Sequence, residues 1–197
     1  MSSNSNNLSD FYLIIPGVEG ESIDKEYPKA IQVLRWRWSE QNSGRWGFGQ
    51  GGGSGKVQMG DFEFEMLTNR ASPKLFLSCA TGEHIPEAQL VCRKSGNGQR
   101  QFLTITFHDG LVSSYLTSGN DASPFVTNAQ GGNAQGVTTA NGNAGGAGNA
   151  GFDLVMPKDR ITINFAEIIY EYREQRDDGS MGAVVKAGYN LKLNAAI

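Results

Sequence analysis

The segment "DRITINFAEIIYEYREQ", Asp159–Gln175, alternates apolar and polar residues with a period of two, which is typical of β-strands. The alternation changes phase near Ala166. The apolar positions before and after that point are Ile161, Ile163 and Phe165, then Ile168, Tyr170 and Tyr172. A strand that is buried on different faces along its length suits a barrel corner or a strand shared with a neighbouring subunit. The segment therefore predicts a β-rich fold whose strands bend between packing partners.

The same alternation extends over most of the 197 residues. Residues 30–41 carry two alternating sets, Leu34, Trp36 and Trp38 on a packed face and Arg35, Arg37 and Ser39 on a face that meets water. In residues 56–68 the apolar phase slips at Gly60, which predicts a β-bulge or a sharp bend. Further strands are expected over residues 10–17, 88–95, 100–109, 111–118 and 183–194, with a hairpin turn at 95–98.

One short helix interrupts the strands. Ser72 suits its N-cap, Pro73 its first turn and Gly82 the left-handed position after its last turn. The apolar stripe between them is formed by Leu75, Phe76 and Cys79. The fold class is therefore mainly β: an antiparallel β-barrel of two packed sheets, closed or nearly closed, with one short α-helix.

A stretch at about residues 119–157 is almost uncharged and rich in Gly, Asn and Ala. Such a composition cannot bury enough apolar area to offset the entropy lost on ordering. We expect a flexible insertion at a strand–strand connection, within a single domain that spans residues 1–197.

The composition excludes several classes of partner. The formal net charge is -3, so nothing favours nucleic acid or an anionic membrane as a partner. The N-terminal residues lack the pattern of a Sec signal peptide, and no apolar run has the roughly 20 residues of a transmembrane helix. We expect a soluble protein that folds in the cytoplasm, with Cys79 and Cys92 as free thiols.

The glycine-rich run "RWGFGQGGGSGKV", Arg45–Val57, contains two nucleotide-binding spellings, G-x-G-x-x-G and G-K. Both need a helix after the glycines, because the helix N-terminus holds the phosphate. A strand pattern follows instead, and Gln50 and Val57 stand where a P-loop needs glycine and a hydroxyl residue. A long hairpin loop accounts for the run better than a nucleotide site.

No convincing catalytic centre, cofactor site or metal site is found. Ser113, His108 and Asp109 contain the residue types of a hydrolase triad, but adjacent strand residues point to opposite faces. Glu63 and Glu65 share a strand face, which a solvated rim explains without acid–base catalysis. The prediction is that the protein is not an enzyme.

Five segments together resemble the Hcp (haemolysin-coregulated protein) family, the tube subunits of the bacterial type VI secretion system. They are "IPGVEGESIDKEY", "IQVLRWRWS", "ASPKLFLSCATGEHIPEAQLVCRKSG", "QFLTITFHDGLVSSY" and "ITINFAEIIYEYREQRDDGSMGAVVKAGYNLKLN". The resemblance covers the chain from Asp10 onward, apart from the insertion. It implies a homohexameric ring with a wide channel that carries effector proteins. Rings stack into a tube inside a contractile sheath, a VgrG-type spike caps the tube, and the protein is secreted after assembly in the cytoplasm.

The resemblance also assigns roles to residues. Arg35 and Arg37 would face the channel and contact effectors, because the strand that carries them lines the channel in the family. The loop after that strand would reach the adjacent ring through Arg45, Trp46, Phe48 and Lys56. In the family the connection that holds the insertion at 119–157 is usually short, so this stretch departs from the pattern. We expect no C-terminal toxin extension of the kind that some relatives carry. Two alternatives remain: an adaptor ring whose insertion recruits cargo without building tubes, and a nucleotide-binding enzyme.

Overall fold

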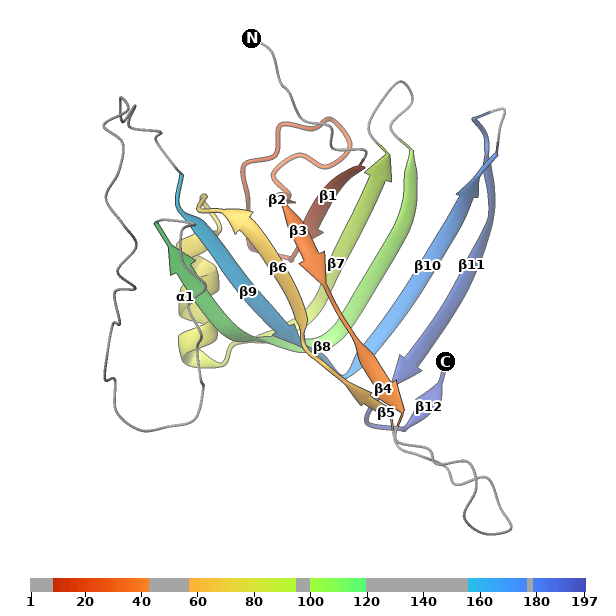
Figure 1. Cartoon of the computed structure of the whole chain (residues 1–197). Helices are drawn as coiled ribbons and strands as arrows, with labels where there is room; N and C mark the ends of the chain where they lie inside the picture. The colour runs from red at the N-terminus through yellow and green to blue at the C-terminus, as the bar shows by residue number, and fades with distance from the viewer. Residues whose placement is uncertain (1–8, 43–56, 95–99, 120–155, 177–178) are drawn as a thin grey trace, which may run out of the picture.

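The computed structural model describes residues 9–42, 57–94, 100–119, 156–176 and 179–197, which form twelve strands and one helix (Figure 1). The strands are β1 (Ser9–Ile14), β2 (Ile31–Val33), β3 (Arg35–Arg37), β4 (Glu40–Asn42), β5 (Val57–Met59), β6 (Phe62–Leu67), β7 (His84–Lys94), β8 (Gln101–Ser118), β9 (Lys158–Asn164), β10 (Glu167–Gln175), β11 (Met181–Asn190) and β12 (Ala195–Ala196). The helix is α1 (Ser72–Thr81). Every strand pair in the described residues is antiparallel, as expected.

The long strand β8 joins two layers. The sequence predicted two strands over 100–109 and 111–118, but the structure has one strand of 18 residues. Its first half pairs with β10, from Leu103 to His108, and its second half pairs with β9, from Leu111 to Ser118. Because β7 pairs with β8 on its other edge, one layer runs β12-β11-β10-β8-β7-β1-β2. The other layer runs β3-β6-β9 and returns to β8.

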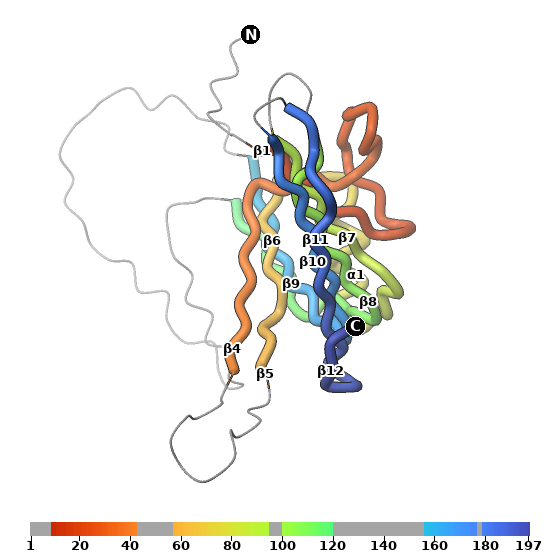
Figure 2. Tube along the Cα trace, turned by 90° about the vertical axis from the view of Figure 1, so that its right-hand side faces the viewer, coloured from red at the N-terminus to blue at the C-terminus, as the bar shows by residue number. Residues whose placement is uncertain are grey.

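The chain passes from one layer to the other at Leu34. Ile31 and Val33 are buried in β2, which pairs with β1, whereas β3 pairs with β6. At this crossing the backbone N–H of Leu34 donates to the backbone carbonyl of Glu65. Leu34 is 40% exposed, so the prediction that it packs with Trp36 was wrong. Figure 2 shows β4 and β6 on one side and β10 and β11 on the other.

The expected closed barrel is not observed. Within the described residues the strand order ends at β2 on one side and at β12 on the other. The crossing at Leu34 separates β2 from β3, and β10, β11 and β12 extend away from the second layer (Figure 1). We call these three strands the wing.

Both predicted changes of phase fall at breaks between strands, and the long strand expected over Asp159–Gln175 is two strands, β9 and β10. Met59 ends β5, Phe62 begins β6, and the backbone N–H of Gly60 donates to Ser39 between them. Asn164 ends β9, Glu167 begins β10, and Ala166 donates its N–H to His108. Each break therefore transfers hydrogen bonding from one partner strand to another.

Aromatic rings fill the centre of the core between the layers. Phe62 stacks on Phe64 with ring centroids 5.0 Å apart and meets Phe107 edge-on at 4.8 Å. Trp36 and Trp38 stack against the same Phe62 ring from the edge of the core. Full burial of such a side chain stabilises a fold by roughly 1.5–3 kcal/mol, so this cluster holds the two layers together.

The helix closes one end of the core, with Leu75 fully buried. Gly82 has the predicted left-handed conformation, with φ of 66°. Ser72 lies inside the helix rather than at its N-cap, and its hydroxyl donates to Asp159, 2.5 Å away in β9. Phe76, predicted in the apolar stripe, is 57% exposed, because α1 buries the face that holds Leu75 and Ser78 and Phe76 lies to the side of that face.

The β8–β9 connection contains the predicted insertion. Ser118 at the end of β8 pairs with Lys158 at the start of β9, so the two ends of the connection are adjacent. Residues 120–155 lie outside the described residues, as does the expected turn at 95–98.

Candidate interaction surfaces

The residue types of a hydrolase triad are not assembled. The Ser113 hydroxyl donates to Asp61, 2.5 Å away, and lies 2.8 Å from the Thr162 hydroxyl. His108 faces Glu87 across 3.7 Å, whereas Asp109 is bound by Lys192 at 2.9 Å. The serine and the histidine therefore have separate partners, as the alternation of strand residues predicts.

The described residues hold neither a metal-binding cluster nor a membrane-spanning helix. No cluster of three His, Cys, Asp or Glu side chains that could hold a metal ion is found in the described part of the chain. No helix in the same part has the length and apolar character to cross a bilayer. Cys79 and Cys92 are free, and burial, partly offset by a hydrogen bond with Trp36, raises the pKa of the Cys92 thiol to about 12.

The outer face of β3, β6 and β9 carries a cluster of ion pairs, which we call the arginine–glutamate cluster. Its members are Arg35, Arg37, Glu63, Glu65 and Arg160. Cross-strand register sets it up, because Arg35, Glu65 and Arg160 lie directly opposite one another on three strands. Arg37 lies opposite Glu63 in the next row.

The guanidinium groups of the cluster bind its carboxylates directly. Arg35 donates from Nη2 to Glu65 Oε2 at 2.5 Å, and Arg37 donates from Nη2 to Glu63 Oε2 at 2.7 Å. Arg160 bridges the rows, with its Nη2 3.2 Å from Glu65 and its Nε 3.4 Å from Glu63. Burial alone would raise the pKa of Glu65, but the hydrogen bonds from Arg35 and Arg160 outweigh it and leave that pKa lowered.

The cluster confirms part of the sequence analysis and extends it. Arg35 and Arg37 lie on the exposed face of their strand, as alternation predicted. Glu63 and Glu65 share a strand face, but Glu65 is buried under ion pairs rather than lying on a solvated rim. Arg160 was missed, although it lies in the polar phase of its strand, because the sequence does not give the register across strands.

The wing carries an apolar face that continues the core. Leu103, Tyr172 and Val185 lie directly opposite one another on β8, β10 and β11. Along this row the exposed fraction rises from 6% to 44% to 68%. The next row of the sheet shows the same rise in exposure. Ile105 is buried, and Tyr170, its partner on β10, is 41% exposed. The inner face of the sheet therefore extends beyond the layer that covers it.

An apolar groove lies beside the wing. It measures about 660 Å³ and separates the β4–β5 hairpin from β10 and β11. Its apolar lining includes Trp38, Val57, Met59, Ile168, Tyr170 and Tyr189. The groove is bounded by β4 and β5, which precede the break at Gly60, and by β10 and β11, which follow the break at Ala166. We call it the wing groove.

The predicted ring-stacking residues Arg45, Trp46, Phe48 and Lys56 lie outside the described residues, between β4 and β5. Strands on both sides of this segment agree with the sequence argument against a phosphate loop, because no helix follows the glycines.

Comparison with known proteins identifies the family. The family model described as "Type VI secretion system effector, Hcp" matches residues 12–172. Protein hcp1 of Pseudomonas aeruginosa is 32% identical over 187 residues, which cover 94% of this chain and 96% of that protein. A solved structure described as a type six secretion system protein is 26% identical with a TM-score of 0.74, over 95% of this chain and 99% of that one. Hcp1 from Salmonella typhimurium is 27% identical with a TM-score of 0.66, over 96% of this chain and 99% of that one. On this evidence the chain belongs to the Hcp family of type VI secretion system proteins.

Proposed function

We propose that this protein is the tube subunit of a type VI secretion system. Six copies close into a ring around a channel, rings stack into a tube, and the channel carries effector proteins. The observation that supports this most directly is the uncovered apolar face of the wing, where exposure rises from 6% at Leu103 to 68% at Val185. Family membership gives the secretion system in which such a ring would work.

The wing face has the properties of a surface that a second copy covers. Tyr170, Tyr172 and Val185 lie on one face of two adjacent strands and are continuous with the core. Full burial of an exposed apolar side chain contributes roughly 1.5–3 kcal/mol, so covering the exposed parts of these three side chains favours association. Large exposed apolar patches on soluble proteins commonly mark interaction sites.

A closed ring needs two different faces on each subunit, because its contacts are head-to-tail. The wing groove shares Tyr170 with the wing face, so the two form one continuous apolar surface between β4 and β5 on one side and β10 and β11 on the other. The neighbouring subunit would cover the wing face and fill this groove with a different face of its own, as head-to-tail contacts require.

In such a ring, the arginine–glutamate cluster would face the channel, with Arg35 and Arg37 as effector contacts. The loop that contains Arg45, Trp46, Phe48 and Lys56 would contact the adjacent ring. A contractile sheath and a VgrG-type spike would be the outer and terminal partners. The protein would be secreted through the system it builds, and its work would be structural rather than enzymatic.

A matched pair of substitutions tests the ring. Val184 and Val185 are neighbours on β11, but they point to opposite faces, and only Val185 shares the face of Tyr172. Val185→Asp is expected to convert the ring to monomers in mass photometry, whereas Val184→Asp leaves the mass of the ring unchanged. A monomeric wild-type protein, or a Val185→Asp variant that assembles as the wild type does, would refute the proposal.

A further inference from the structure

We infer that the outer face of β3, β6 and β9 binds an acidic protein segment through the guanidinium groups of the arginine–glutamate cluster. This inference rests on the proposed function, because the segment would belong to an effector protein carried by the ring. It adds the chemistry of the cargo: aspartate and glutamate side chains on the surface that meets the tube.

The cluster is arranged with its positive groups outward. The side chains of Arg35 and Arg37 are 70% and 77% exposed, and that of Arg160 is 41% exposed. The carboxylates beneath them are far less accessible, at 9% for Glu65 and 21% for Glu63. A partner that approaches this face therefore meets guanidinium groups before it meets carboxylates.

The buried carboxylates also hold the guanidinium groups in place. Arg37 donates to Glu63 from one nitrogen, Nη2, and its high exposure leaves the rest of the fork directed to solvent. A guanidinium carries five N–H donors in a rigid plane that matches the two oxygens of a carboxylate. Because Glu63 already restricts the rotamers of Arg37, less conformational entropy is lost when a second carboxylate binds.

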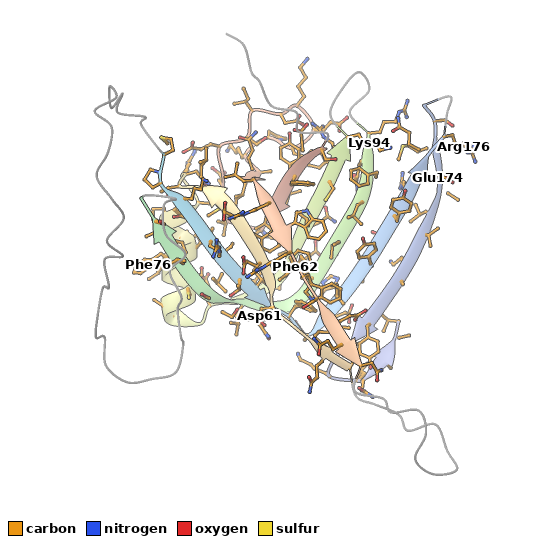
Figure 3. The ribbon with its side chains drawn as sticks, in the orientation of Figure 1. Asp61, Phe62, Phe76, Lys94, Glu174 and Arg176 are labelled. Atoms are coloured by element: carbon orange, nitrogen blue, oxygen red, sulfur yellow. The ribbon has the colours of Figure 1, made fainter. Side chains whose placement is uncertain are left out.

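The most accessible charges of this face are opposite in sign to the net charge of the chain. Three guanidinium groups, those of Arg35, Arg37 and Arg160, stand against the carboxylates of Glu63 and Glu65. Asp61 lies at the lower end of β6 (Figure 3), where Ser113 and Asn164 bind its two carboxylate oxygens. The exposed guanidinium groups, which stand above less accessible carboxylates, favour acidic partners over basic ones.

The size of the positive excess favours protein over nucleic acid. Tight binding of a nucleic acid requires many phosphates to be neutralised by lysine and arginine. Here the exposed cations are few, and Trp36, the aromatic residue between Arg35 and Arg37, packs against Phe62 at the edge of the core and is not available to stack on bases. A short acidic segment needs only a few carboxylate–guanidinium contacts.

The test measures binding of a fluorescein-labelled oligoglutamate peptide to the full-length protein by fluorescence anisotropy, with labelled oligothymidylate as the second probe. The variants are Arg37→Glu, Arg37→Gln and Lys25→Glu. Lys25 is an exposed lysine between β1 and β2, and its reversal changes the net charge by the same amount as Arg37→Glu. It therefore separates a local contact from the charge of the whole protein.

The wild type is expected to bind oligoglutamate with an affinity that falls as sodium chloride is raised. Arg37→Glu should weaken binding by about fivefold or more, Arg37→Gln by less, and Lys25→Glu should leave it nearly unchanged. The inference is overturned if oligoglutamate does not bind, if Arg37→Glu and Lys25→Glu weaken binding equally, or if oligothymidylate binds more tightly.

Mass photometry of the same samples separates this inference from the proposed function. A ring that fails to bind oligoglutamate refutes the acidic-cargo inference and leaves the tube proposal standing. A monomer that binds oligoglutamate through Arg37 refutes the ring and leaves the binding face standing.

Discussion

Glu65 and Glu63 occupy equivalent positions on β6, yet the structure predicts unequal consequences when each is replaced by glutamine. Glu65 is 9% exposed and accepts hydrogen bonds from Arg35 at 2.5 Å and Arg160 at 3.2 Å. Glu63 is 21% exposed and binds Arg37, which is itself 77% exposed. Replacement of Glu65 leaves the partly buried Arg160 without the shorter of its two ion pairs. Replacement of Glu63 leaves Arg37 unpaired, but Arg37 is exposed and is readily solvated.

The magnitudes follow from burial. A hydrogen bond to a charged group is worth about 1.5–3 kcal/mol when buried, and exposed ion pairs are worth about 0–1 kcal/mol. Arg35 is 70% exposed, so solvation recovers part of its loss. We expect Glu65→Gln to lower the free energy of unfolding by about 1–2 kcal/mol and Glu63→Gln by about 0.5 kcal/mol.

The difference for Glu65 depends on pH in a defined direction. Its pKa in the folded protein is lowered from the ordinary value of 4.5. The stabilisation is therefore present above that value and is lost as the pH falls through the folded pKa, where the carboxylate takes up a proton. The gap between wild type and Glu65→Gln should shrink as the pH is lowered below 4.5.

Urea unfolding followed by tryptophan fluorescence measures this gap, because Trp36 lies on β3 and stacks on Phe62 at 5.4 Å. All proteins are compared at one subunit concentration, since association contributes to apparent stability. The reasoning fails if Glu65→Gln and Glu63→Gln lose equal stability at neutral pH. It also fails if the Glu65→Gln gap is undiminished in acid.

Three further predictions concern other parts of the fold. Asp159→Asn should lower the free energy of unfolding by about 3 kcal/mol and weaken the hydrogen-exchange protection of α1, because the buried Asp159 carboxylate accepts a hydrogen bond from Ser72. Unchanged thermal unfolding would contradict this. At mildly alkaline pH, Ellman's reagent should modify Cys79 and spare Cys92 until urea is added, since Cys92 is buried and burial raises its pKa to about 12. Rapid modification of both thiols in the native protein would refute this. Deletion of residues 121–153 should preserve the fold and the ring, because β8 and β9 are paired up to the ends of that connection. Loss of the β-sheet signal in the circular dichroism spectrum of the deletion variant would contradict this.

Much of the fold could be predicted from local pattern. Alternation placed most strands, and the phase changes at Gly60 and Ala166 marked real breaks, because burial of one strand face imposes a period of two. Gly82 was predictable since its left-handed conformation favours glycine. These features depend on a few consecutive residues, which a sequence displays directly.

The remainder depends on contacts between distant segments. Leu34 alternates in phase with Trp36, but the chain changes layers there, so no local pattern marks its exposure. Ser72 has the chemistry of an N-cap, yet it binds Asp159, 87 residues away. The pairing of Arg160 with Glu65 and Glu63 needed the register of β6 against β9. Whether the strands close into a barrel likewise depends on pairing between segments far apart in the sequence, which alternation does not reveal.

The central claim is that this chain forms a homohexameric ring. Negative-stain electron microscopy of the purified protein, combined with mass photometry, tests it most directly. The account predicts rings with an open centre and six times the chain mass of 21.3 kDa. Compact particles of the mass of one chain, with no central opening, would contradict it.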